Sequence, residues 1–129
     1  MAHLPRPGAR PIFLNLIQIQ MPVGALTSIG HRMTGVLLAV SAPIAVYLLD
    51  ISLRNEQGFV EAMVWVNSWA FKAATFVLVW ALAHHMLAGV RHLLTDISVG
   101  STLYTARRSA WAVNLGGVVI ALLVGGLWL

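Results

Sequence analysis

The sequence of 129 residues contains no cysteine. Without thiols the chain cannot form disulfide bonds, cannot ligate haem through a thiolate and cannot hold a cysteine-bound iron–sulfur cluster. A metal bound by this chain must therefore be held by histidine or carboxylate side chains.

Charged residues are also scarce, at 9% of the sequence, whereas hydrophobic residues make up 59% and the mean hydropathy is +0.83. A soluble domain carries roughly 25% charged residues, so this chain has too little polar surface to cover a water-soluble globule. Acidic residues number only four against eight lysines and arginines, which gives a net charge of +4. In so apolar a chain, this excess indicates membrane orientation and not nucleic-acid binding.

Three stretches without charged residues are long enough to cross a bilayer as helices. They lie between Arg32 and Asp50, between Lys72 and Arg91, and after Arg108. As helices they would measure about 27, 28 and 31 Å, which matches a hydrocarbon core of ~30 Å. The sequence predicts an all-α membrane protein whose single membrane domain spans 24–129. Its three transmembrane helices are expected near residues 24–51, 62–97 and 106–128.

The orientation of these spans follows from the basic residues. Prolines interrupt the N-terminal segment and no compact apolar core follows, so we interpret 1–23 as a cytoplasmic arm and not as a cleaved signal peptide. Basic residues gather before the first span and around the loop between the last two: Arg6, Arg10, Arg91, Arg107 and Arg108. The positive-inside rule then places the N-terminus in the cytoplasm and the C-terminus in the periplasm. We expect a multi-pass protein of the bacterial inner membrane.

The second span carries an unusual number of polar groups in "HHMLAGVRHLLTD", residues 84–96. His85 lies about 9 Å along the helix from Arg91, well inside the bilayer. Polar groups at such a depth are costly and usually mark a functional path. His85, Gly89 and His92 fall on one helical face. The missing side chain at Gly89 leaves room for a flat object beside His85.

Two interpretations of these histidines follow. They could merely hydrogen-bond to neighbouring helices, or they could bind a cofactor, because a neutral imidazole is a good axial ligand for haem iron. The second interpretation favours His85 as the ligand, with Arg91 or His92 near the propionates. His84 is about 100° around the helix and is expected to face another helix or a partner. No other histidine lies at a matching depth, so a second axial ligand is expected from another subunit.

The first span opens with a second polar cluster, "SIGHRMTG", residues 28–35. Ser28, His31 and Arg32 stand at i, i+3 and i+4 and share one helical face. Alone, Arg32 would be a membrane-edge anchor and Ser28 a helix cap. Together the three groups suit a quinone headgroup, whose two carbonyl oxygens accept hydrogen bonds. Arg32 would stabilise a semiquinone anion electrostatically, and His31 is a candidate proton donor.

Both polar clusters lie within segments that carry a family resemblance. "RPIFLNLIQIQMPVGALTSIGHRMT" (10–34) resembles the first signature of the cytochrome b subunits of succinate dehydrogenase, with its Arg-Pro start and Ser-x-x-His-Arg-x-Ser/Thr end. "HMLAGVRHLLTD" (85–96) resembles the second signature, His-x-x-x-Gly-x-Arg-His-…-Asp. Two departures are Thr95, where the family usually has an aromatic residue or Met, and His84, where relatives often have Tyr.

The resemblance implies a membrane anchor that forms a helical bundle with a second small anchor subunit. Together they would hold an iron–sulfur subunit and a flavoprotein against the membrane. Electrons from succinate oxidation would pass through the iron–sulfur subunit to ubiquinone or menaquinone, in the tricarboxylic acid cycle and respiratory chain. The flavoprotein would oxidise succinate, so this chain would be part of an enzyme without oxidising succinate itself.

The resemblance also implies roles for individual residues. One haem b would be shared by the two anchors, with His85 and a histidine of the second anchor as axial ligands. Ser28 and Arg32 would bind quinone. Three further residues would lie near the quinone and the propionates: His31, Arg91 and His92. Asp96 would either relay protons or stay structural, capping its helix against Arg91.

Other functions remain as alternatives. An equivalent anchor of a fumarate reductase would differ in physiological direction. A small proton-linked transporter or channel subunit would use the buried histidines as a proton path and would show no haem spectrum. A haem-free structural anchor is the third alternative. The third span contains glycines that suit close helix–helix packing: Gly116, Gly117, Gly125 and Gly126.

Overall fold

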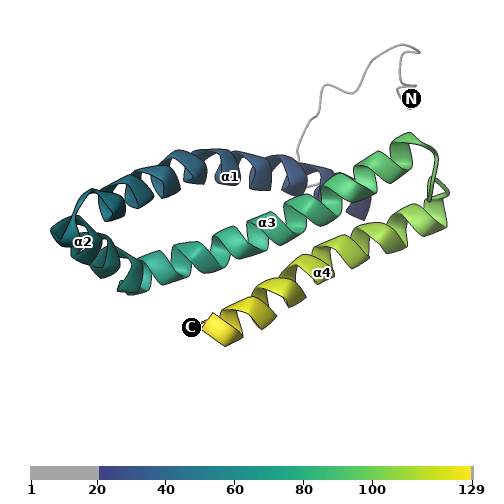
Figure 1. The fold of residues 1–129 in the computed structure, drawn as a ribbon. Helices are drawn as coiled ribbons and strands as arrows, with labels where there is room; N and C mark the ends of the chain where they lie inside the picture. Colours follow the sequence, from purple (N-terminus) through teal and green to yellow (C-terminus); the bar gives the residue numbers. More distant parts are fainter. Residues whose placement is uncertain (1–20, 129) are drawn as a thin grey trace, which may run out of the picture.

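The computed structural model describes residues 21–128, which form four helices (Figure 1). The helices are α1 (Val23–Arg54), α2 (Glu56–Asn67), α3 (Trp69–Asp96) and α4 (Leu103–Trp128). Helix α3 runs antiparallel to both α1 and α4 and contacts both of them (Figure 1). The described part of the chain contains no β-strand. Of the predicted arm 1–23, residues 1–20 lie outside the described residues.

Three of the helices are long and apolar enough to cross a membrane. Helices α1, α3 and α4 have 32, 28 and 26 residues, or about 48, 42 and 39 Å of helix, against a hydrocarbon core of ~30 Å. Helix α2 has 12 residues and, at about 18 Å, is too short to cross. The prediction of an all-α membrane protein with three transmembrane helices is therefore confirmed.

The helix expected near residues 62–97 is in fact two helices, α2 and α3, which meet at Ser68. The backbone of Ser68 is extended, and its Oγ accepts a hydrogen bond from the N–H of Phe71 at 3.3 Å. The Ser68 hydroxyl also donates to the carbonyl of Trp65 at 2.7 Å. Serine is favoured at this N-cap position because its oxygen satisfies a free N–H at the start of a helix. The single-helix prediction was wrong because apolar residues continue on both sides of this cap.

Replacing Ser68 by alanine removes this cap and is expected to destabilise the protein by about 1 kcal/mol. The measurement is thermal unfolding of the purified protein followed by circular dichroism. Ser52→Ala is the matched control, because the Ser52 hydroxyl bonds only to the Leu49 carbonyl within α1, at 2.7 Å. Equal melting temperatures for the two variants would contradict the capping role.

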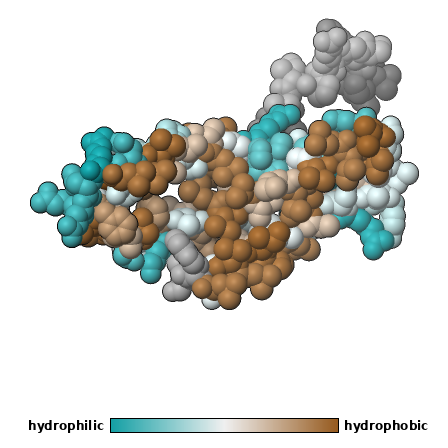
Figure 2. Space-filling model, viewed as in Figure 1, coloured by the Kyte–Doolittle hydropathy of each residue, from teal (hydrophilic) through white to brown (hydrophobic). Residues whose placement is uncertain are grey.

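The helices pack through small side chains, while most large apolar side chains face outward. The buried hydrophobic residues are Ala62, Ala81, Ala88, Ala110, Val113 and Ala121. Small residues let helix backbones approach closely, as is typical of packing within membranes. Figure 2 shows hydrophobic atoms over the middle of the molecule and hydrophilic atoms towards its two ends. The outer surface is therefore suited to lipid and to the helices of other subunits.

Candidate functional site

His85 is oriented by its contacts with α1. Its Nδ1 lies 3.0 Å from the backbone carbonyl oxygen of His31 and 3.4 Å from Oγ1 of Thr34. The Thr34 hydroxyl donates to the carbonyl of Gly30 at 2.8 Å. Because a carbonyl oxygen only accepts, Nδ1 of His85 carries the proton and Nε2 keeps its lone pair. A backbone carbonyl fixes the tautomer of metal-ligating histidines in the same way.

The side chains of His31, His85 and His92 form one cluster, named here the histidine cluster. The rings of His31 and His85 are stacked, with centroids 4.1 Å apart and an interplanar angle of 17°. The centroids of His31 and His92 are 5.2 Å apart. All three residues are half-buried. Two helices thus bring together imidazoles from both polar clusters of the sequence.

The ring of His31 occupies the side of α3 where Gly89 lacks a side chain. A Cβ on Gly89 would lie 3.5 Å from Nε2 of His31, an ordinary van der Waals contact. The sequence predicted that this space would receive a flat object beside His85. In the structure, the flat group nearest to Gly89 is the imidazole of His31.

His84 has quite different surroundings from His85. It is only 4% exposed, and its Nε2 lies 3.1 Å from Oδ1 of Asn114 on α4. Its Nδ1 is buried and has no hydrogen-bond partner among the described residues. As its helical position predicts, His84 faces other helices of the chain. Neither of its nitrogens is open to an external ligand.

Arg91 connects α3 to α4 and not to the histidine cluster. Its Nε donates to Oγ of Ser109 at 3.1 Å, and its Nη2 donates to the carbonyl of Ala106 at 3.3 Å. Asp96, the last residue of α3, is exposed. Within residues 21–128 the structure forms no ion pair between Asp96 and Arg91. The structure therefore does not support the interpretation that Asp96 caps its helix against Arg91.

Ser28 and Arg32 make no side-chain contact by hydrogen bond or ion pair within residues 21–128. Ser28 is half-buried and Arg32 is exposed, one turn apart on α1. Neither side chain makes a hydrogen bond to another described residue. A guanidinium group has five N–H donors and a hydroxyl has one. The two side chains can therefore supply several donors to a ligand that carries acceptor oxygens.

Comparison with known proteins identifies the family. Residues 6–124 match the family described as succinate dehydrogenase/fumarate reductase transmembrane subunit. The chain belongs to this family. The succinate dehydrogenase cytochrome b556 subunit of Coxiella burnetii is 31% identical over 122 residues, which covers 93% of this chain and 96% of the relative. That of Paracoccus denitrificans is 34% identical over 116 residues, covering 90% and 89%.

A mitochondrial relative shows the same likeness at lower identity. The succinate dehydrogenase cytochrome b560 subunit of Mus musculus is 28% identical over 120 residues, which covers 91% of this chain and 68% of that protein. The family match over residues 6–124 includes both polar clusters and reaches into all three membrane spans.

Three polar residues of this succinate dehydrogenase/fumarate reductase subunit were not singled out from the sequence. Thr27 and Thr34 are fully buried, and Asn114 links α4 to both α1 and α3. Thr34 is the last residue of the first signature motif. Asn114 is an amide within an apolar span, and such an amide often bonds across helices. That signal was available in the sequence.

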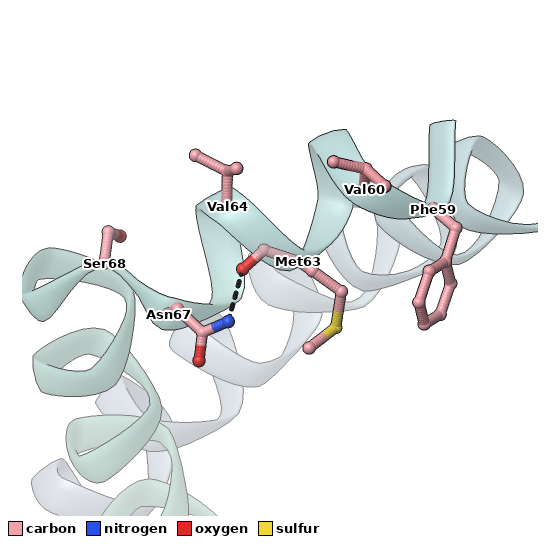
Figure 3. A pocket seen from close by; sticks show the side chains of 6 residues that line it. All are labelled: Phe59, Val60, Met63, Val64, Asn67 and Ser68. Carbon is pink, nitrogen blue, oxygen red and sulfur yellow. Dashed lines mark hydrogen bonds between the residues drawn. The ribbon is translucent and has the colours of Figure 1, made fainter. Parts of the chain in front are cut away.

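One hollow lies away from the histidines, on the outer face of α2 (Figure 3). Its volume is about 510 Å³, and no ionisable side chain lines it. The residues around it are Phe59, Val60, Met63, Val64, Asn67 and Ser68. The Asn67 side chain donates to the carbonyl of Met63 at 2.8 Å. Because this hollow has no ionisable side chain, the histidines remain the candidate functional site of the succinate dehydrogenase/fumarate reductase subunit.

Proposed function

We propose that the chain is the membrane-anchoring cytochrome b subunit of a succinate dehydrogenase and passes electrons from succinate oxidation to quinone. The observation that carries this proposal is the family match over residues 6–124, together with relatives of the same length that are named cytochrome b556 subunits. Three membrane-spanning helices support it. The protein is a multi-pass protein of the bacterial inner membrane. The distribution of basic residues supports a cytoplasmic N-terminus and a periplasmic C-terminus.

The proposal includes one haem b, held by Nε2 of His85. The donor fits the group, because the bond from Nδ1 to the His31 carbonyl leaves Nε2 with a free lone pair in a half-buried position. His84 does not fit, since its nitrogens are enclosed between helices. A bound haem supplies a one-electron carrier within the membrane. Among residues 21–128 one imidazole meets these conditions, which supports sharing of the haem with a second anchor subunit that supplies the other axial ligand.

Two members of the histidine cluster are proposed as neighbours of the haem propionates or the quinone, namely His31 and His92. Their imidazoles can donate hydrogen bonds to carboxylate or carbonyl oxygens. Arg91 is proposed to act from a distance, since its guanidinium is bonded to α4. Asp96 is exposed at the end of α3, which is compatible with the proton-relay interpretation. The proposed partners are the second anchor subunit, the iron–sulfur subunit and the flavoprotein.

The proposed quinone contacts are Ser28 and Arg32, whose donors have no partner among the described residues. The quinone bound by these two side chains would be ubiquinone or menaquinone. Both quinones present two ring carbonyl oxygens to such donors. The Arg32 guanidinium would also stabilise negative charge on the headgroup during reduction.

Replacing Ser28 or Arg32 by alanine should impair quinone reduction by roughly tenfold or more, because a hydrogen bond to a charged group contributes about 1.5–3 kcal/mol. Succinate oxidation coupled to a soluble dye should survive, since that reaction needs no quinone site. The measurement compares the two activities in the purified complex. Arg107→Ala is the matched control, as Arg107 is an exposed arginine at the start of α4. Unchanged quinone reduction in both variants would remove these residues from the site.

The whole proposal is tested by purifying the complex through a tag on this chain. A flavoprotein, an iron–sulfur protein and a dithionite-reduced b-type spectrum should copurify. A colourless protein without those partners would instead favour the transporter or channel alternative. Comparing succinate oxidation with fumarate reduction in the same preparation addresses the fumarate reductase alternative, which the family description also includes.

A further inference from the structure

His84 is enclosed by two glycines on the neighbouring helices. A Cβ on Gly30 of α1 would lie 2.9 Å from Cε1 of His84. On the other side, a Cβ on Gly117 of α4 would lie 3.2 Å from Cβ and 3.3 Å from Cα of His84. Trp80 packs against the same imidazole, with ring centroids 5.7 Å apart. Gly30 therefore packs against the imidazole ring, while Gly117 packs against the backbone and Cβ of the same residue.

A single oxygen atom joins three helices beside this ring. Oδ1 of Asn114 on α4 lies 3.1 Å from Nε2 of His84 on α3 and 3.1 Å from Oγ1 of Thr27 on α1. An amide oxygen has two lone pairs and can accept both bonds, while the single Thr27 hydroxyl proton is shared with the Val23 carbonyl at 3.0 Å. Nε2 of His84 then carries the proton. Thr27 and His84 are buried and Asn114 is half-buried, so most of this contact lies between the helices.

The rotation of α3 about its axis determines where both adjacent histidines point. Consecutive residues of an α-helix are separated by about 100°, so fixing the direction of His84 also fixes the direction of His85. His85 has its own close fit to α1, since a Cβ on Gly35 would lie 2.9 Å from its Cε1. In this register the Nδ1 of His85 meets the carbonyl of His31.

We infer that His84 is a positioning residue for His85. Enclosed by Gly30 and Gly117 and hydrogen-bonded to Asn114, it sets the rotation of α3 and thereby holds the Nε2 of His85 towards its ligand. The inference rests on the proposed function, in which His85 ligates haem.

The test compares two variants in the intact, purified complex. His84→Leu keeps a bulky apolar side chain but loses the bond to Asn114. This variant should shift the haem midpoint potential and change the electron paramagnetic resonance signal from that of the wild type. His84→Gln retains an N–H donor that can reach Asn114, and it should restore both. Met86→Leu, at an exposed position of α3, should leave both unchanged.

A His84→Leu complex with the wild-type potential and resonance signal overturns the inference. If that variant does not assemble, Asn114→Leu decides by the same criteria, since it removes the shared oxygen at nearly constant volume. Failure of His84→Gln to restore the signal also counts against a role for this hydrogen bond. Absence of b-type haem from the wild-type complex would overturn the proposed haem site itself, which is a separate result.

Discussion

Replacing His85 by alanine is expected to abolish the b-type absorbance of the purified complex. Within the histidine cluster, His85 is the residue whose Nδ1 is bonded to a backbone carbonyl, at 3.0 Å. Its Nε2 therefore keeps the lone pair that can bind iron. Alanine has no donor for iron, and a six-coordinate haem cannot form with the remaining ligand alone. The measurement is the dithionite-reduced minus oxidised spectrum, scaled to flavin content.

Two controls make this result specific. Met86→Ala alters the next residue of α3, which is 62% exposed, and should leave the absorbance intact. His84→Gln should also retain it, because His84 is enclosed between helices. A complex that keeps its haem in His85→Ala and loses it in His84→Gln would show that His84 is the ligand.

Replacing Gly117 by alanine is expected to lower the stability of the bundle by about 1–3 kcal/mol, the usual cost of overpacking a closely packed core. The added methyl group would meet the Cβ, Cα and backbone nitrogen of His84, at 3.2, 3.3 and 3.4 Å. These are main-chain or adjacent atoms and cannot rotate away. α3 and α4 must therefore separate. Thermal unfolding of the purified complex, followed by circular dichroism, measures the effect.

The same helix supplies the matched controls. A Cβ on Gly126 would have nothing within 4 Å, so Gly126→Ala should be neutral or slightly stabilising, because alanine favours a helix by about 1 kcal/mol over glycine. Gly116→Ala should fall between the two, because its neighbour at 3.2 Å is the mobile Cδ1 of Leu87. Equal melting temperatures for Gly117→Ala and Gly126→Ala would contradict the close contact.

The membrane spans could be predicted from the sequence because a charge in lipid is costly, so charged residues mark where the spans end. The break at Ser68 could not, since the apolar residues on both sides continue the pattern of a single helix. The break depends on a short-range competition, in which one hydroxyl oxygen satisfies a free N–H and ends the preceding helix.

The candidate site was predictable in part for a similar reason. Periodicity correctly separates the faces of His84 and His85, because it describes one helix at a time. It says nothing about which side chain of another helix fills a space, so the stacking of His31 on His85 near Gly89 was not foreseen. The contact of Arg91 with α4 likewise depends on tertiary packing.

The carbonyl that orients His85 belongs to this chain's own first helix. If His85 ligates haem as proposed, the pairing of α1 and α3 within this chain is enough to establish the tautomer that ligation requires. Such preorganisation lowers the entropy lost when a ligand is captured. The newly inserted chain would then already present Nε2 of His85 for binding to iron. The order in which haem and the second anchor subunit join would not affect this ligand.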